Sequence, residues 1–192
     1  MKKNILIILG HPKADSYCAA LADAYSDGAK AGGNEVRKLH ISELTFDPIL
    51  WNGYSKTQEL EPDLAQAQEL ISWSHHIVFV YPIWWGTMPS LLKGFLERIL
   101  LPGFAFKYRD DSVWWDKLLQ GKTAHLITTL DTPSWYYRFI YSRPGYNQMK
   151  KVILGFCGIK VNKVSQFSPI KGSSLEKRVK WLSKVKQDGM NV

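Results

Sequence analysis

The stretch that decides the fold is residues 4–21, NILIILGHPKADSYCAAL, in which a short apolar run ends in a Gly-His-Pro turn. The run predicts a β-strand over Asn4–Leu9, and Ser16 is a typical N-cap residue for a following helix. The first amides of a helix have no intrahelical acceptor and lie at the positive end of its dipole. With His11 and Lys13 as further donors, this turn favours a phosphorylated ligand.

The rest of the chain repeats this alternation of strand and helix. Strands are predicted over Asn4–Leu9, Glu35–His40, His76–Tyr81, Thr123–Thr129 and Lys160–Phe167. Helices are predicted over Ser16–Lys30, Glu61–Ser74, Pro89–Leu101, Tyr146–Phe156 and Ser173–Gln187. Such regular alternation indicates the α/β class, as a doubly wound five-stranded parallel sheet of strand order 2-1-3-4-5 with helices on both faces.

The composition fits one domain that spans residues 1–192. The chain is 45% hydrophobic and 22% charged, which suits one well-cored globular unit and argues against disorder. No apolar run reaches the about 20 residues that a membrane span needs, and the N-terminal run lacks a signal-peptide cleavage pattern. The two cysteines, Cys18 and Cys157, form no CxxC pair, so we expect a cytoplasmic protein without a metal site.

The net charge of +8 is concentrated in the last part of the chain. Residues 150–192 hold ten Lys or Arg against two acidic residues, whereas the preceding part is neutral. These basic residues alternate with apolar ones at helical spacing: Leu175, Val179, Leu182 and Val185. The pattern is typical of an amphipathic surface helix with a solvated basic face, so no nucleic-acid partner is expected.

Unusual residues follow three of the predicted strands. HPKADSY follows the first, YPIWWGTMP the third and TTLDTPSWYY the fourth. Doubly wound sheets bind ligands at the carboxyl ends of their strands, so these loops should meet around one site. Trp84 and Trp85 would offer planar walls to a heteroaromatic ring such as isoalloxazine; the alternative is that they only cap the sheet edge.

Motifs for other chemistries are absent from the sequence. It contains no GxxxxGKS or GxxxxGKT phosphate loop, no GxGxxG fingerprint, no HExxH and no GxSxG. The neighbouring carboxylates Asp110 and Asp111 fall in a hydrophilic stretch and are interpreted as a solvated loop. The histidines within or beside strands are interpreted as structural: His40, His75, His76 and His125.

The motifs GHPKADSYCAAL, YPIWWGTMPSLLKGFLERILLPGFAFKY and TTLDTPSWYY resemble those of the NAD(P)H:quinone oxidoreductases of the flavodoxin-like superfamily, the group that includes bacterial quinone reductases of the modulator of drug activity B type. The resemblance covers about residues 4–157. It implies a flavodoxin-like fold, a tightly bound flavin that is FAD, with FMN as the alternative, and NAD(P)H as co-substrate. It also implies a homodimer with active sites at the subunit interface.

The motifs and the resemblance together assign the site. Catalytic roles fall to Tyr136 or Tyr137, as donors of a hydrogen bond or proton. The residues expected to bind the cofactor are His11, Lys13, Ser16, Tyr17, Pro82, Ile83, Trp84, Trp85, Gly86, Thr128, Thr129, Leu130 and Asp131. The pair Leu130-Asp131 stands where eukaryotic relatives carry two glycines, so this loop departs from the family pattern.

The activity that the resemblance implies is a two-electron, ping-pong hydride transfer from NAD(P)H through the flavin to a quinone or similar planar acceptor. Two alternatives remain at this point. One is a regulatory flavoprotein subunit that docks on a membrane transporter, which the basic C-terminal helix favours. The other is a flavodoxin-like binding module that holds no flavin.

Overall fold

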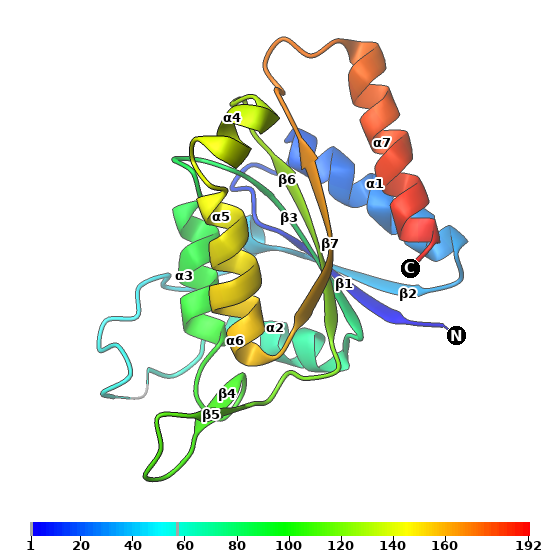
Figure 1. Cartoon of the computed structure of the whole chain (residues 1–192). Coiled ribbons are helices and arrows are strands. Elements are labelled where there is room, and N and C mark those ends of the chain that lie inside the picture. Colours follow the sequence, from blue (N-terminus) through cyan, green and yellow to red (C-terminus); the bar gives the residue numbers. More distant parts are fainter. Residues whose placement is uncertain (1, 57) are drawn as a thin grey trace.

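The computed structural model describes residues 2–56 and 58–192 and is built on a five-stranded parallel sheet. Its strand order is β2-β1-β3-β6-β7 (Figure 1). The strands are β1 (Asn4–Leu9), β2 (Glu35–His40), β3 (His76–Pro82), β6 (Thr123–Thr129) and β7 (Lys160–Phe167). Counted along the chain, this order is the predicted 2-1-3-4-5, so the doubly wound fold class is confirmed.

Helices cover both faces of the sheet (Figure 1). One face carries α1 (Tyr17–Ala31) and α7 (Leu175–Met190). The other carries α2 (Pro62–Trp73), α3 (Ser90–Ile99) and a continuous helical segment made of α5 (Pro144–Asn147), π-type turns (Gln148–Leu154) and α6 (Gly155–Cys157). Successive residues of β1 alternate between the two cores, since Ile5 and Ile7 pack with α1 whereas Leu6 and Ile8 pack with α2 and α3.

Two small elements were not predicted. The first is an antiparallel ribbon of β4 (Phe106–Tyr108) and β5 (Trp115–Lys117), which Figure 1 shows at the end of the molecule opposite α4. The second is α4 itself (Ser134–Phe139), directly after the loop that follows β6. Both were predicted as loop because strands of three residues and a helix of six are too short to show a hydrophobic period.

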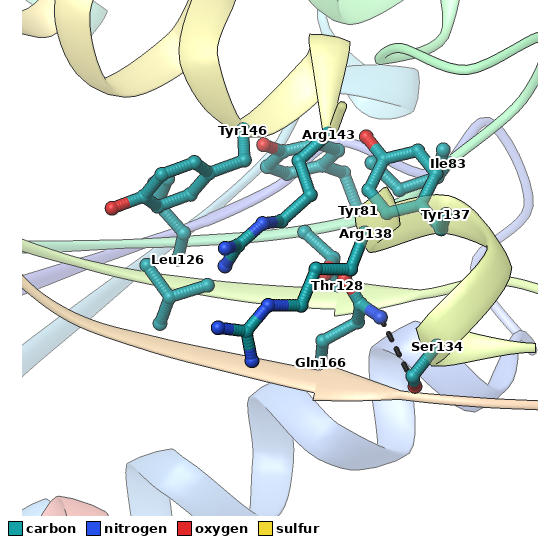
Figure 2. Close-up of a pocket in the computed structure, with 11 residues that line it drawn as sticks. Tyr81, Ile83, Leu126, Thr128, Ser134, Tyr137, Arg138, Arg143, Tyr146 and Gln166 are labelled. Atoms are coloured by element: carbon teal, nitrogen blue, oxygen red, sulfur yellow. Dashed lines mark hydrogen bonds between the residues drawn. The ribbon is translucent and has the colours of Figure 1, made fainter. Parts of the chain in front are cut away.

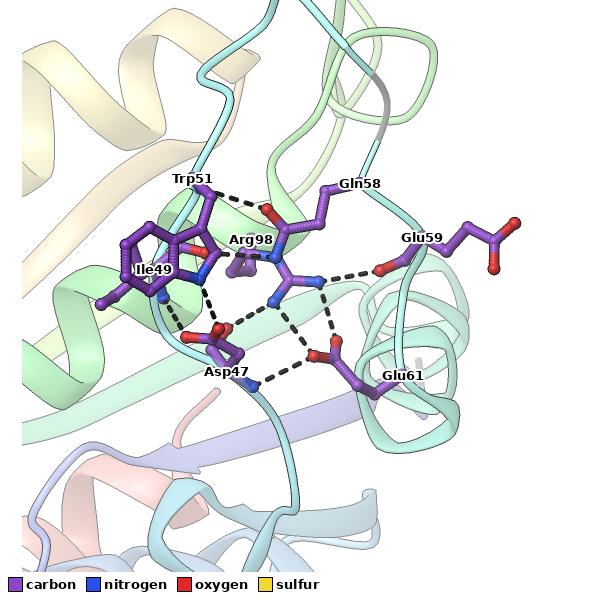
Figure 3. A network of polar contacts seen from close by, with 7 residues as sticks. All are labelled: Asp47, Ile49, Trp51, Gln58, Glu59, Glu61 and Arg98. Atoms are coloured by element: carbon purple, nitrogen blue, oxygen red, sulfur yellow. Dashed lines mark hydrogen bonds and ion pairs between the residues drawn. The ribbon is translucent and has the colours of Figure 1, made fainter.

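The long connection from β2 to α2 is anchored by one buried arginine (Figure 3). Arg98 of α3 is fully buried and donates to both carboxylate oxygens of Glu61, at 2.8 and 3.1 Å. It also donates to the carbonyl oxygens of Glu59, at 2.9 Å, and of Asp47. Arg98 therefore holds two parts of this connection to α3, one at Asp47 and the other at Glu59 and Glu61.

The C-terminal helix α7 is amphipathic, but its buried face is shorter than predicted. Ser174 caps it by accepting from the Lys177 amide at 3.2 Å, and Val185 is fully buried. Leu175 and Val179 were predicted on the apolar face but are 79% and 52% exposed, because the side of α7 that packs with α1 carries Trp181, Leu182 and Val185 instead. Within the described ranges, none of the helices has the length and apolarity to cross a bilayer.

Candidate functional site

A cleft of about 340 Å³ opens at the carboxyl edge of the sheet, where the loops after β1, β3, β6 and β7 meet. Its position is where a doubly wound fold holds its ligand. It is lined by His11, Lys13, Asp15, Ser16, Tyr17, Cys18, Pro82, Ile83, Trp84, Thr129, Leu130, Asp131 and Ile170. Of the predicted cofactor-binding residues, the lining excludes Trp85, Gly86 and Thr128.

The first wall of the cleft is the N-terminus of α1. The Ser16 hydroxyl accepts from the Ala19 amide at 3.2 Å, which caps the helix. The amides of Tyr17 and Cys18 belong to the first turn and have no acceptor within the helix. Because these N–H groups lie at the positive end of the dipole, this wall suits an anionic group such as phosphate.

His11 contributes a neutral donor to this wall. Its Nδ1 accepts a hydrogen bond from the Lys13 amide at 2.9 Å, which leaves the ring proton on Nε2. Partial burial lowers the pKa of His11 below its usual value, so the imidazole is uncharged at neutral pH. The positive side chain beside it, Lys13, forms an exposed ion pair with Asp15 at 3.1 Å.

The second wall is a tight turn after β3. The amides of Trp84 and Thr87 bond each other's carbonyls, at 2.9 and 3.0 Å. Trp85 and Gly86 between them have positive φ angles of 50° and 83°, as in a type I′ turn. Since the Ile83 amide donates to the Thr129 carbonyl at 2.7 Å, the amides of Ile83 and Trp84 are used inside the protein.

This turn gives the two tryptophans different positions. The Trp84 indole is 45% exposed and lines the cleft. The Trp85 indole stands at the tip of the turn, fully exposed, and borders a neighbouring hollow of about 500 Å³ together with Gly86 and Tyr141. The aromatic wall of the cleft itself is therefore Trp84, whereas the sequence predicted that both indoles would form it.

The third wall is the end of β6. The Cys18 thiol and the Thr129 hydroxyl lie 3.2 Å apart and join this strand to α1. Successive strand residues face opposite sides of a sheet, so Thr128 points to the other face, where it lines a second cavity with Tyr81. The structure thus separates Thr128 from Thr129, although the sequence prediction placed both on one ligand edge.

The loop after β6 is braced against the loop after β7. The Leu130 amide donates to the Phe167 carbonyl, and its carbonyl accepts from the Ile170 amide, both at 3.1 Å. A carboxylate oxygen of Asp131 accepts from the Lys171 amide at 2.7 Å. These bonds occupy the backbone of Leu130, so this stretch shapes the cleft and does not offer its amide to a ligand.

Tyr17 lines the cleft with its ring only. Its hydroxyl donates to the Arg178 carbonyl at 2.9 Å, and its ring packs 6.4 Å from that of Trp181. Burial raises the pKa of Tyr17, in keeping with this enclosed position. The hydroxyl therefore holds α1 to α7 and is not directed at a ligand.

The two candidate catalytic tyrosines sit differently on α4. The Tyr137 hydroxyl is buried, donates to the Gly86 carbonyl at 2.9 Å and accepts from the Gly145 amide at 3.1 Å. Tyr136 is half-buried, with its ring edge-on to that of Tyr141 at 5.0 Å, and no hydrogen bond among the described residues involves its hydroxyl. Tyr137 is thus fully committed to structure, and Tyr136 is free to contact a ligand, although it does not line the cleft.

The comparison with known proteins agrees with this architecture. A family model described as flavodoxin-like fold matches residues 3–187. The chain belongs to this family. The solved structure of Smu.1420 from Streptococcus mutans UA159 is 32% identical to this flavodoxin-like protein, with a TM-score of 0.84 over 98% of this chain and 100% of that chain.

Curated relatives of this flavodoxin-like protein carry oxidoreductase names. NAD(P)H dehydrogenase (quinone) 1 of Rattus norvegicus is 28% identical over 189 residues, which cover 83% of this chain and 66% of the rat protein. An uncharacterized NAD(P)H oxidoreductase of Haemophilus influenzae is 29% identical over 162 residues, covering 81% of this chain and 79% of that protein. The resemblance to NAD(P)H:quinone oxidoreductases is thereby confirmed, although this chain spans only about two thirds of the rat protein's length.

Three residues of this flavodoxin-like cleft were not predicted to bind a ligand: Asp15, Cys18 and Ile170. Asp15 lies between Lys13 and Ser16, which were predicted to bind the cofactor, so its place in the same loop could have indicated that it lines the cleft. Cys18 was interpreted as a buried apolar residue; burial raises the pKa of its thiol to about 11, which keeps it protonated. Among the described residues, no group of His, Cys, Asp and Glu is arranged to hold a metal ion.

Proposed function

We propose that this protein is a flavin-dependent NAD(P)H oxidoreductase that reduces quinones or similar planar acceptors. The observation that carries the proposal is that the N-terminus of α1 and the Trp84 indole line the same cleft. One wall suits a phosphate and the other a planar ring, which are the two ends of a flavin nucleotide. The oxidoreductase names of the curated relatives support the same reaction class.

The residues present fit such a cofactor. The amides of Tyr17 and Cys18 and the Nε2–H of His11 would hold its phosphate, because all three are donors in the cleft lining. Trp84 and Thr129, which line the same cleft, would border its ring system. A bound flavin would supply the two-electron hydride chemistry of the proposed reaction.

We assign FAD as the cofactor and keep FMN as the alternative. A helix N-terminus alone suits one phosphate, whereas here His11 and Lys13 extend the donor set along the loop before α1. Two phosphates in series, as in FAD, would use this longer row of donors. The Lys13 ammonium would have to exchange its Asp15 partner for the ligand, which costs little because the pair is exposed.

Tyr136 is the residue to which we assign contact with the reacting acceptor. Its hydroxyl is available, whereas that of Tyr137 is bonded on both sides. A phenol near the acceptor donates a hydrogen bond and so stabilises the negative charge that develops on a quinone oxygen during reduction. Tyr137 instead fixes Gly86 and with it the turn that carries Trp84 and Trp85.

We further propose a homodimer with the acceptor site at its interface. Large apolar side chains stand exposed around the rim of the neighbouring hollow and on α4, and a patch of this kind is typical of a protein contact surface. They are Trp85, Trp135, Phe139, Ile140 and Tyr141. Pairing two copies across this rim would cover these side chains and enclose the planar acceptor.

The alternative function, a flavoprotein subunit that docks on a membrane transporter, is favoured by one observation. The outer face of α7 exposes the apolar side chains of Leu175 and Val179 among basic residues. Such a face can meet an anionic partner surface.

The test is an assay of the purified, flavin-loaded protein with NADH and NADPH in separate reactions and a soluble quinone as acceptor. Quinone-dependent NAD(P)H consumption at enzyme-like rates is expected, with the same rate in the matched surface variant Lys184→Gln. Loaded protein that does not consume NAD(P)H would overturn the enzymatic proposal. Co-purification with a membrane protein that is lost in Val179→Asp would then favour the docking subunit.

A further inference from the structure

A second cavity, of about 300 Å³, is drawn in Figure 2. It lies on the opposite face of β6 from the flavin cleft, since it is lined by Thr128 and the cleft by Thr129. The two share only Ile83 in their linings. The second cavity is bounded by the ends of β3, β6 and β7 and by α4 and α5, and its lining is Tyr81, Ile83, Leu126, Thr128, Ser134, Tyr137, Arg138, Arg143, Tyr146, Val164 and Gln166. It is therefore a separate site and not an extension of the proposed cofactor cleft.

Two arginines give this second cavity a positive charge that the protein does not balance. Arg138 and Arg143 both line it, and the lining contains no carboxylate. Among the described residues, neither guanidinium takes part in an ion pair. Figure 2 shows both side chains extending in the same direction across the cavity. Two adjacent guanidinium groups without a counter-charge favour an oxyanion between them.

A buried hydroxyl in the same cavity also lacks a partner. Tyr81 is fully buried at the end of β3, it lines the cavity, and its hydroxyl makes no hydrogen bond within the described structure. A buried polar group without a partner is destabilising, so such groups are rare in native proteins. A ligand that accepted this hydroxyl proton would remove the penalty.

The remaining lining divides into a polar rim and an apolar base. The amide of Gln166 donates to the Ser134 hydroxyl at 3.2 Å. Leu126 and Val164 form an aliphatic base, and the Tyr146 ring lies beside Arg143, whose guanidinium carbon is 5.7 Å from the ring centroid. A ligand for this lining therefore needs an apolar or aromatic body in addition to its charge.

We infer that this second cavity binds a small organic oxyanion, a carboxylate or phosphate ester with an apolar or aromatic body, whose charged group lies between Arg138 and Arg143. The body packs against Leu126 and Val164, and the Tyr81 hydroxyl donates to an oxygen of the ligand. The inference does not depend on the proposed oxidoreductase activity, because the flavin cleft lies on the other face of the sheet.

The inference is tested by calorimetric titration of the flavin-loaded protein with benzoate and, separately, phenyl phosphate. Inorganic phosphate tests the charge alone, and benzyl alcohol tests the ring alone. We expect saturable one-site binding of benzoate or phenyl phosphate and at least tenfold weaker binding of the two simpler probes. Arg138→Gln and Arg143→Gln should each weaken binding about tenfold or more, whereas the exposed lysine variant Lys184→Gln should leave it unchanged.

Tyr81→Phe separates ligand binding from a purely structural role. It should raise the melting temperature of the ligand-free protein, since it removes an unpaired buried hydroxyl, and at the same time weaken probe binding several-fold. Absence of saturable binding by either organic probe would overturn the inference, as would equal affinity in the two arginine variants and wild type. Binding that occurs only after flavin is removed would show that the probes occupy the flavin cleft, and this result would also overturn the inference.

Discussion

The imidazole of His11 meets the indole of Trp84 edge-on, with ring centroids 5.4 Å apart and ring planes at 72°. These residues are far apart in the sequence, one in the loop after β1 and the other in the turn after β3. Their contact brings the anion-binding end of the flavin cleft directly against its aromatic wall. A cofactor that bound there would touch both loops, and each of the following predictions uses one part of this arrangement.

His11 should contribute to flavin affinity through its Nε2–H. Because Nδ1 already accepts from the Lys13 amide, only Nε2 is free for a phosphate. His11→Ala should weaken flavin binding by about tenfold, which corresponds to about 1.4 kcal/mol. In His11→Asn the side-chain oxygen can still accept from the Lys13 amide, so this variant keeps the turn, whereas its NH2 group takes the place of the imidazole Cδ2 and stops short of the Nε2–H position. Fluorescence titration should give the same loss in both, and full affinity in the asparagine variant would show that His11 only shapes the loop.

Tyr136→Phe should lower turnover, whereas Tyr137→Phe should lower stability. The first removes a hydroxyl with no internal partner, so it should lower quinone turnover roughly tenfold without changing flavin affinity or stability. The second breaks bonds to the Gly86 carbonyl and the Gly145 amide, so it should lower the free energy of unfolding by about 1–3 kcal/mol.

Urea unfolding and steady-state kinetics on both tyrosine variants separate these effects. Undiminished turnover in Tyr136→Phe would remove this residue from the reaction. Wild-type stability in Tyr137→Phe would mean that its two hydrogen bonds do not hold the turn in solution.

Trp85→Asn should change function without destabilising the fold. Trp85 is fully exposed with a φ of 50°, a conformation that asparagine adopts more readily than tryptophan. The free energy of unfolding should therefore stay the same or rise by up to about 1 kcal/mol. The KM for the quinone should increase, and dimerisation measured by sedimentation should weaken. Trp114→Asn, at another exposed tryptophan, is the control; equal effects at both positions would contradict a specific role for the turn.

Arg98→Met should be one of the most destabilising single substitutions in the chain. It leaves the Glu61 carboxylate without its partner at 2.8 Å and frees the connection before α2, at a cost of about 3–5 kcal/mol. Arg109→Met is the matched control, since Arg109 pairs with Asp116 at 2.6 Å on the exposed ribbon and should lose at most about 1 kcal/mol. Similar unfolding midpoints for the two variants would refute the anchoring role of Arg98.

Two buried histidines should make the fold acid-sensitive. Burial lowers the pKa of His76 to about 4 and that of His125 to about 3, whereas both titrate near 6.5 in the unfolded chain. Between the folded and unfolded pKa values, the unfolded state binds more protons than the folded state. The free energy of unfolding should therefore fall as pH drops from about 6.5 toward 4, by roughly 1 kcal/mol per pH unit for each histidine. His125→Gln should reduce this slope in urea titrations at several pH values, while the exposed His75→Gln should not.

The sheet was predictable from the sequence because its signal is local. β1, β2, β6 and β7 have the predicted bounds. β1 and β6 are nearly continuous buried runs, as expected of inner strands, whereas β2 and β7 are edge strands with mixed polar and apolar residues. Ser16 and Pro62 likewise marked the starts of α1 and α2. The meeting of the loops after β1, β3 and β6 followed from topology, since parallel strands present their carboxyl ends at one edge.

The details of the site were less predictable because they depend on tertiary contacts. No local pattern indicates that the Tyr137 hydroxyl bonds Gly86, or that the Ile83 amide is taken by the Thr129 carbonyl. Thr128 and Thr129 face opposite sides of the sheet, as alternation along a strand requires. They were nevertheless predicted on one ligand edge, because the family resemblance places both there. The second cavity depends on α4, which is too short to be found from periodicity.

The most direct test of the central claim, that one cleft joins a phosphate site to an aromatic wall and holds a flavin, is the visible absorption spectrum of the purified protein, followed by chromatography of the released cofactor. We predict a yellow protein that carries one flavin per chain, released as FAD, and loses it in His11→Ala under dialysis that leaves the wild type loaded. A colourless protein that binds neither added FAD nor added FMN would contradict the account.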